Sequence, residues 1–357
     1  MNRNSSWKWL LMMVALLVLV AGCGKQASPQ STIQSALVKS MELQSYTFSG
    51  SVNVEKLTLP NAFLQSEGPE AQLALNLLQN MTIDVKGSHQ IEPMRMELTA
   101  DIALKGDFSF NLSIPMIITE DTMLVKVPNI PMLPLGDLAG KYIEIDMNEL
   151  AKEENLDIPS YNPETQQKLV QDMISIILKH LDGEQYFQSV KLDEATGLPS
   201  DLKLDEAVKV SVTQTNFEAA VIALAEKAAP EFIELVAQNE EYMKALNLKK
   251  QDIEDAKKEL TPEKLQEVKK DLEDIKKELT INELSMLGGI QDGYMTYQHF
   301  KADLSFKVDN EDANLVLNMT SRYDNLNKPI EKQADIPKDQ IIPYENLMEM
   351  GDFGTSF

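Results

Sequence analysis

The chain has one cysteine, Cys23, and its surroundings suit attachment of a lipid to the thiol. It ends a Val-Ala-Gly-Cys sequence at residues 20–23, after an apolar run over residues 10–20 and a basic start. As a helix this run spans about 16 Å, roughly half of a bilayer's ~30 Å hydrocarbon core. Small residues before the cysteine fit a narrow peptidase site. The sequence therefore predicts a cleaved signal peptide over residues 1–22 and a thioether-linked diacylglycerol on Cys23. An ordinary signal-anchor cysteine is the alternative.

The charge of the chain limits its partners. Removing residues 1–22 takes away two of the 33 basic residues and none of the 56 acidic ones, which leaves a formal charge of −25. Nucleic acid and bare anionic membrane are therefore poor partners. The diacylglycerol on Cys23 has to hold the protein at the extracytoplasmic face of the cell membrane. The polar residues 23–32, which include Pro29, are expected to form a disordered tether.

Residues that usually carry catalysis are sparse. The histidines His89, His180 and His299 are far apart and have no metal-ligand spacing, and no Gly-x-Ser-x-Gly elbow or phosphate-binding glycine loop occurs. We therefore expect a non-enzymatic protein without a metal or cofactor. The many acidic residues leave a carboxylate pair for glycoside hydrolysis open, without locating it.

The pattern that decides the fold class is an alternation of apolar and polar residues. In residues 46–54 Tyr, Phe, Gly and two Val alternate with polar side chains, which predicts a strand with one apolar face. About ten such segments predict an α+β fold with a strongly curved antiparallel sheet. The further segments are residues 81–85, 94–104, 108–114, 124–127, 143–147, 202–212, 295–308 and 313–323.

Helical periodicity predicts the helices that cover the apolar face and one additional helical segment. Residues 33–43, 70–79 and 164–181 are amphipathic and are expected to cover the sheet. Residues 216–287 are rich in Lys and Glu and predict an inserted helical hairpin or coiled-coil arm, whose seam steps by three and four residues. This arm either packs on itself or docks a protein partner. The seam residues are Leu265, Val268, Leu272, Ile275 and Leu279.

Several segments together resemble a known group of proteins. With the Val-Ala-Gly-Cys sequence, residues 43–50, 94–104, 123–127, 140–146 and 319–330 are similar to the LolA/LppX-type bacterial lipoproteins. The resemblance implies an open half-barrel whose concave apolar face is lidded by helices and holds a lipid or acyl chain. It assigns residues 33–215 and 288–346 to this domain and leaves residues 347–357 as a tail. The insertion at 216–287 departs from a minimal carrier.

Two functions are considered from these observations. The first is binding of a lipid or acylated ligand between sheet and helices, where many of the 18 methionines would give an adaptable surface. The second is an envelope scaffold or regulatory lipoprotein that acts through its helical arm. A hydrolase is a third and weaker alternative. The expected cavity residues are Phe48, Val52, Met96, Leu98, Ile102, Phe110, Leu112 and Leu204, with Met173 and Ile177 as the lid.

Overall fold

A computed structural model describes most of the chain, whereas the predicted signal peptide and Cys23 lie outside the described part. The described residues are 27–106, 109–130, 135–149, 163–193, 195, 197–308, 311–332 and 335–349. Within them, no helix combines the length and the apolar character needed to cross a membrane. Lipidation of Cys23 therefore stays a prediction.

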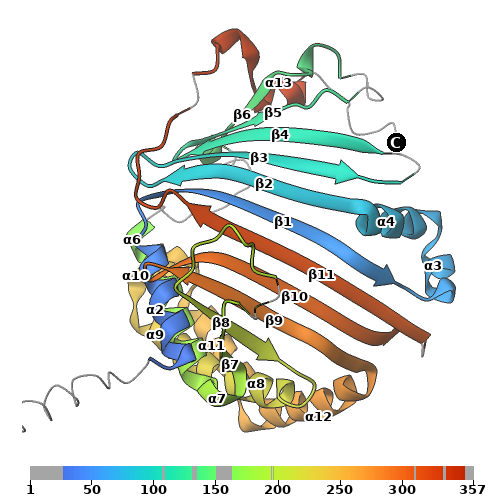
Figure 1. Cartoon of the computed structure of the whole chain (residues 1–357), viewed down its shortest axis with the longest axis vertical. Coiled ribbons are helices and arrows are strands. Elements are labelled where there is room, and N and C mark those ends of the chain that lie inside the picture. Colours follow the sequence, from blue (N-terminus) through green and yellow to red (C-terminus); the bar gives the residue numbers. More distant parts are fainter. Residues whose placement is uncertain are drawn as a thin grey trace, which may run out of the picture.

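The chain forms an α+β fold around one open, curved sheet of 12 strands (Figure 1). From edge to edge the order is β12-β6-β5-β4-β3-β2-β1-β11-β10-β9-β8-β7. Paired strands run antiparallel except β12 and β6, which are parallel. The predicted class and the curved sheet are thus confirmed. The strands are β1 (Ser45–Thr58), β2 (Met81–Gln90), β3 (Arg95–Leu104), β4 (Phe110–Thr119), β5 (Thr122–Lys126), β6 (Tyr142–Asp146), β7 (Phe187–Val190), β8 (Glu206–Val212), β9 (Leu279–Gln291), β10 (Tyr294–Val308), β11 (Glu311–Asp324) and β12 (Ile341–Pro343).

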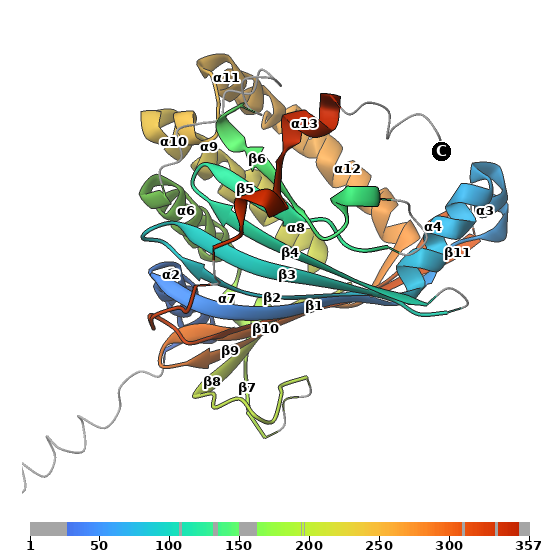
Figure 2. The ribbon, with the colours of Figure 1, turned by 90° about the horizontal axis from the view of Figure 1, so that it is seen from above.

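Helices gather over one face of the sheet, and the described residues of the loop 191–205, which are 191–193, 195 and 197–205, lie on the other (Figure 2). We call these the helix face and the loop face. A π-helical turn at Leu224–Ala228 joins two of the helices, and 3-10 turns occupy Gly136–Leu138 and Lys338–Gln340. The helices are α2 (Pro29–Met41), α3 (Asn61–Glu67), α4 (Pro69–Asn80), α6 (Pro163–His180), α7 (Gly183–Tyr186), α8 (Phe217–Ala223), α9 (Ala229–Gln238), α10 (Glu240–Ala245), α11 (Lys250–Glu259), α12 (Pro262–Glu278) and α13 (Tyr344–Glu349).

Two adjacent glycines of β9 show how alternation separates the faces. A Cβ built on Gly288 would lie 2.8 Å from Met295 Sδ and 3.6 Å from Ile33 of α2. A Cβ on Gly289 would instead lie 2.7 Å from Leu204 of the loop. Neighbouring residues of a strand point to opposite faces. Helix α2 therefore approaches Gly288 closely on one face, and the loop approaches Gly289 closely on the other.

Helix α2 begins within the segment that was expected to be a tether. Pro29 is in its first turn, and Ser28 caps it by accepting a hydrogen bond from the Ser31 backbone N–H at 3.2 Å. A proline at the start of a helix loses no needed donor, so Pro29 marks a helix start here rather than a tether. The helix is fixed by Ile33 and Ala36, which are 1 % and 2 % exposed in the main hydrophobic core.

The segment between β8 and β9 packs onto the helix face. Its helices end at Glu278, because Leu279–Gln291 forms strand β9 and not the end of the predicted arm at residue 287. In α12, Leu272 is buried with Phe217 of α8 and Ile281 of β9, and Val268 packs against this cluster. An apolar helix stripe is stabilised by any apolar surface, and here that surface is formed by α8 and the sheet.

The five predicted seam residues consequently have different environments. Val268 and Leu272 face the cluster just described, and Leu279 opens β9 and packs there as well. Leu265 is half-buried and Ile275 is 44 % exposed. A single exposed apolar side chain is ordinary for a protein surface and indicates no docking site.

Replacing Ile33 by alanine tests whether α2 is part of the core. Ile33→Ala removes apolar atoms from a fully buried position, so we expect the free energy of unfolding to fall by about 2–4 kcal/mol in urea denaturation. The exposed Ser35→Ala change on the same helix serves as the control and should leave it within about 0.5 kcal/mol. Equal stability of the two variants would mean that α2 is only a tether.

Candidate functional site

The half of the helix face formed by β1 to β6 contains most of the predicted cavity residues. The strand register places Val52 in one row with Ile102 and Leu112, and Phe48 in one row with Leu98. Alternation brings the remaining strand candidates, Met96 and Phe110, to the same face. These side chains are half-buried, except that Phe110 is 50 % exposed. The structure thus unites Phe48, Val52, Met96, Leu98, Ile102, Phe110 and Leu112 on one surface.

Leu204 does not belong to this surface, and the prediction for it is wrong. Strand β8 begins only at Glu206, so Leu204 lies in the loop at residues 191–205. There it packs against Gly289 on the loop face. An apolar residue just before a strand continues the alternation in the sequence, but the chain bends at Asp205, before the strand begins.

The two predicted lid residues lie on the outer stripe of α6. Met173 is 37 % exposed, Ile177 is half-buried, and both continue the helical spacing of Gln166 and Val170. Leu169, on another side of α6, packs with buried residues of α9, α10 and α11. The helix is therefore held from one side while its Val170–Met173 stripe remains accessible.

At one end of the apolar surface lies a pocket that the sequence did not reveal. Two adjoining cavities of about 280 and 290 Å³ share Met41, His89 and Ile91, and we call them together the end pocket. The Gln167 side chain of α6 donates a hydrogen bond to the Met41 carbonyl of α2 at 2.5 Å and closes the pocket between the two helices. The other lining residues are Leu37, Ser40, Leu43, Tyr46, Met94, Gln166, Val170, Met295, Gln298 and Tyr323.

His89 is the polar group at the centre of the end pocket. Its ring lies 5.2 Å from that of Tyr46, which in turn lies 5.5 Å from Tyr323. Its Nδ1 atom is buried and has no hydrogen-bond partner among the described residues. Burial lowers the pKa of the imidazole, so a neutral ring with one donor and one acceptor is favoured. As a lone histidine in a strand, it carried no sequence signal.

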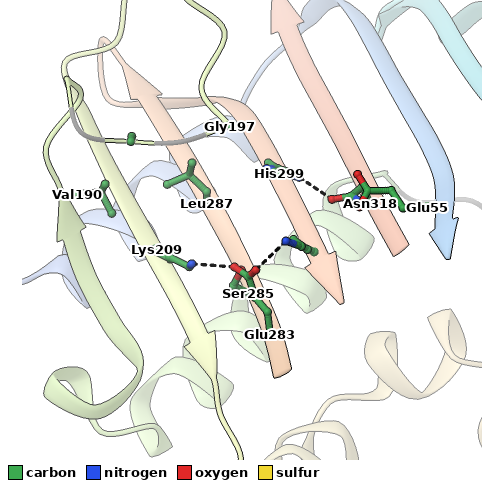
Figure 3. Close-up of a pocket in the computed structure, with 11 residues that line it drawn as sticks. Glu55, Val190, Gly197, Lys209, Glu283, Ser285, Leu287, His299 and Asn318 are labelled. Carbon is green, nitrogen blue, oxygen red and sulfur yellow. Dashed lines mark hydrogen bonds and ion pairs between the residues drawn. The ribbon is translucent and has the colours of Figure 1, made fainter. Parts of the chain in front are cut away.

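A second cavity, of about 360 Å³, lies on the loop face (Figure 3). Its centre is Glu283 of β9, which binds Lys209 of β8 at 2.9 Å and Lys301 of β10 at 3.0 Å. The Ser285 hydroxyl donates a further hydrogen bond to Glu283 at 2.9 Å. We call this cavity the polar pocket. Glu55, Val190, Ala195, Gly197, Leu287, His299 and Asn318 complete its lining.

The hydrogen bonds at Glu283 outweigh the effect of its burial. Burial alone would raise the pKa of the carboxyl, whereas hydrogen bonds from Lys209, Lys301 and Ser285 lower it to about 2. The same contact raises the pKa of the Lys301 ammonium. The three charges therefore form one stable network at neutral pH.

Neither pocket carries the elements of a metal centre in the described part of the chain, where no three His, Cys, Asp or Glu side chains converge. The end pocket combines apolar walls with one imidazole, two phenols, the Ser40 hydroxyl and three glutamine amides, which suits an apolar ligand with a polar group. No protein-family model matches this chain, and no curated protein matches it.

The pH dependence of stability tests the state of His89. Its folded pKa lies below the unfolded value of 6.5, so the unfolded chain binds more protons and stability falls as pH drops through about 6.5. His89→Phe should flatten this slope in urea denaturation between pH 7.5 and 5. Ser88→Ala, the neighbour on the loop face, should retain it. An unchanged slope in His89→Phe would contradict the buried neutral ring.

Glu283→Gln tests the charge network. Its pKa is depressed from 4.5 to about 2, so the stability it contributes is present above about pH 4.5 and is lost as pH falls towards 2. The Glu283 side chain is 31 % exposed, so we expect a cost of about 1–2 kcal/mol at pH 7. The wild-type and variant unfolding curves should converge near pH 2. The exposed Glu273→Gln change is the control, and a cost independent of pH would argue against the network.

Proposed function

We propose that this chain is a membrane-anchored, non-enzymatic lipoprotein that binds the acyl chain of a lipid on the helix face of β1 to β6. The observation that supports this most directly is the unequal covering of that face. On β1 to β4 its side chains are half-buried or exposed, apart from Leu104. A continuous apolar surface of this kind is typical of an interaction site.

The other half of the same face is an ordinary packed core. Helices α2, α8 and α12 cover β7 to β10, where Phe187, Val208 and Ile281 are 4 %, 1 % and 7 % exposed. These helices thus cover the half of the helix face formed by β7 to β10. The half-covered part is accordingly not needed for the core, which favours a role in binding.

The chemistry of the half-covered surface suits a flexible hydrocarbon chain. Met81, Met96, Met116 and Met319 share it, because the register sets each opposite a residue of the same face. Unbranched thioether side chains adapt to variable apolar contents. Each methylene that leaves water contributes about 0.8 kcal/mol. The polar group of the lipid would lie at the end pocket, where the His89 ring offers an unpaired nitrogen.

The predicted lipid anchor would keep the protein at a membrane, and the membrane would be the source of the ligand. Diacylglycerol on Cys23 would leave only residues 24–27 between the lipid and the Ser28 cap of α2, and so would keep the sheet near the bilayer surface. A LolA/LppX-like half-barrel is the fold that we propose for this arrangement, with the helix face as its lidded concavity. The segment 213–278 would then extend the lid instead of forming a separate docking arm.

Mass spectrometry of co-purified lipid tests the proposal. A soluble form that starts at Gly24 retains every described residue and excludes the covalent anchor as a source of lipid. Purified from a bacterial host without detergent, it should carry lipid in a fixed ratio. Leu98→Asp places a charge on the apolar surface and should reduce the bound lipid at least tenfold.

The matched control is Thr99→Asp, which adds the same charge to the same strand on the loop face. It should retain the lipid, and both variants should show a cooperative unfolding transition. A protein that contains no lipid and takes up none from added vesicles would overturn the proposal. Equal loss in both variants would also count against a site on the helix face.

A further inference from the structure

The polar pocket is a formed cavity and is separate from the lipid site. It lies on the loop face (Figure 3), whereas the apolar surface and the end pocket lie on the helix face. The loop that walls it is fixed to the sheet at three places. Tyr297 donates a hydrogen bond to the Gly197 carbonyl at 2.8 Å, Arg322 pairs with Asp201, and Leu204 packs on Gly289.

The charges of the polar pocket are already balanced within the protein. Lys209 and Lys301 both bind Glu283, and the carboxylate of Glu55 lines the same cavity. Asp303 adds a further negative field at Lys301. An anionic ligand would approach the two carboxylates that line the cavity, Glu55 and Glu283, and a cationic ligand would approach two ammonium groups. The balance favours an uncharged ligand.

The same cavity contains hydrogen-bonding groups that the fold leaves unused. Asn318 accepts a hydrogen bond from His299 Nε2 at 3.1 Å through Oδ1, whereas its Nδ2 is buried and has no partner among the described residues. His299 donates through Nε2, and in the neutral ring this leaves Nδ1 as an acceptor. A Cβ on Gly197 would lie 2.8 Å from this Nδ1, and the glycine therefore leaves the ring room.

Donors and acceptors thus lie in one cavity beside an apolar wall. The ammonium groups keep spare N–H donors, the Asn318 amide adds another, and His299 Nδ1 and Glu55 accept. Leu287 and Val190 provide the apolar side of the cavity. A sugar ring presents this combination of hydroxyl groups around its edge and C–H groups on its faces. The volume of about 360 Å³ is near the lower end of the range of about 300–1,000 Å³ for ligand pockets.

We propose that the polar pocket binds a single uncharged sugar unit, with Asn318 and His299 as its hydrogen-bonding residues. This site is independent of the lipid site on the opposite face. It would give the anchored protein a second ligand of a different chemical class. If the polar pocket does not bind a sugar, the lipid-binding proposal is unaffected.

Isothermal titration calorimetry on the full chain in phosphatidylcholine nanodiscs tests this inference. The probes are methyl glucoside and N-acetylglucosamine, with acetate and phosphate as anionic probes. We expect at least one sugar to bind with a millimolar dissociation constant and neither anion to bind. Ala195→Trp should fill the cavity and weaken sugar binding at least tenfold, whereas Ser200→Trp, exposed on the same loop, should not.

A second pair of variants tests the hydrogen bonds. Asn318→Ala should weaken binding about tenfold, whereas Asn53→Ala, its cross-strand neighbour outside the cavity, should leave it unchanged. If Asn318→Ala does not fold, the tryptophan pair decides. Binding of phosphate or acetate in place of the sugars, the absence of any sugar binding, or equal binding by Ala195→Trp and wild type would each overturn the inference.

Discussion

The pairing of β1 with β11 joins the two halves of this protein into one sheet. Residues 47–58 of β1 lie against residues 314–324 of β11, so strands from the two ends of the sequence become central neighbours. Every row of side chains that crosses the sheet passes through this pair. A register slip of one residue would turn the apolar row of Val52 to the loop face and expose it to water. Both pockets depend on this alignment, because each takes residues from β1 or β11.

The two faces of the sheet carry different kinds of side chain on the same strands. On the helix face, apolar side chains fill a core over β7 to β10 and form a half-covered surface over β1 to β6. On the loop face, polar side chains form ion pairs and hydrogen bonds beneath a fixed loop. The described residues contain two buried polar side-chain atoms without a partner, His89 Nδ1 and Asn318 Nδ2. Each lies at a pocket on its own face, and buried polar groups are normally paired in folded proteins.

Much of the fold and part of the proposed lipid site could be predicted from the sequence. The alternation in residues 46–54 and 94–104 predicted strands β1 and β3 and assigned Phe48, Val52 and Leu98 to one apolar face, because side chains of a strand alternate regardless of its partners. The boundaries were less certain. Pro29 is compatible with a tether but begins α2, and residues 279–287 continue the predicted arm in the sequence but form β9. In both cases one residue type is compatible with two local structures, and burial against the sheet selects between them.

The sequence by itself determined the class of fold, the apolar face of most strands and the predicted lipid attachment at Cys23, because these depend on local periodicity and on a short contiguous motif. Only the tertiary structure decided the order of the strands, the side of the sheet that each connection covers, and the pockets. Leu204 lies on the loop face, the apolar stripe of α12 packs on α8 and β9, and His89 lies with residues of α2 and α6. The physical reason is that pockets and helix packing arise from contacts between residues far apart in the chain, and periodicity within one segment does not encode which distant surface it meets.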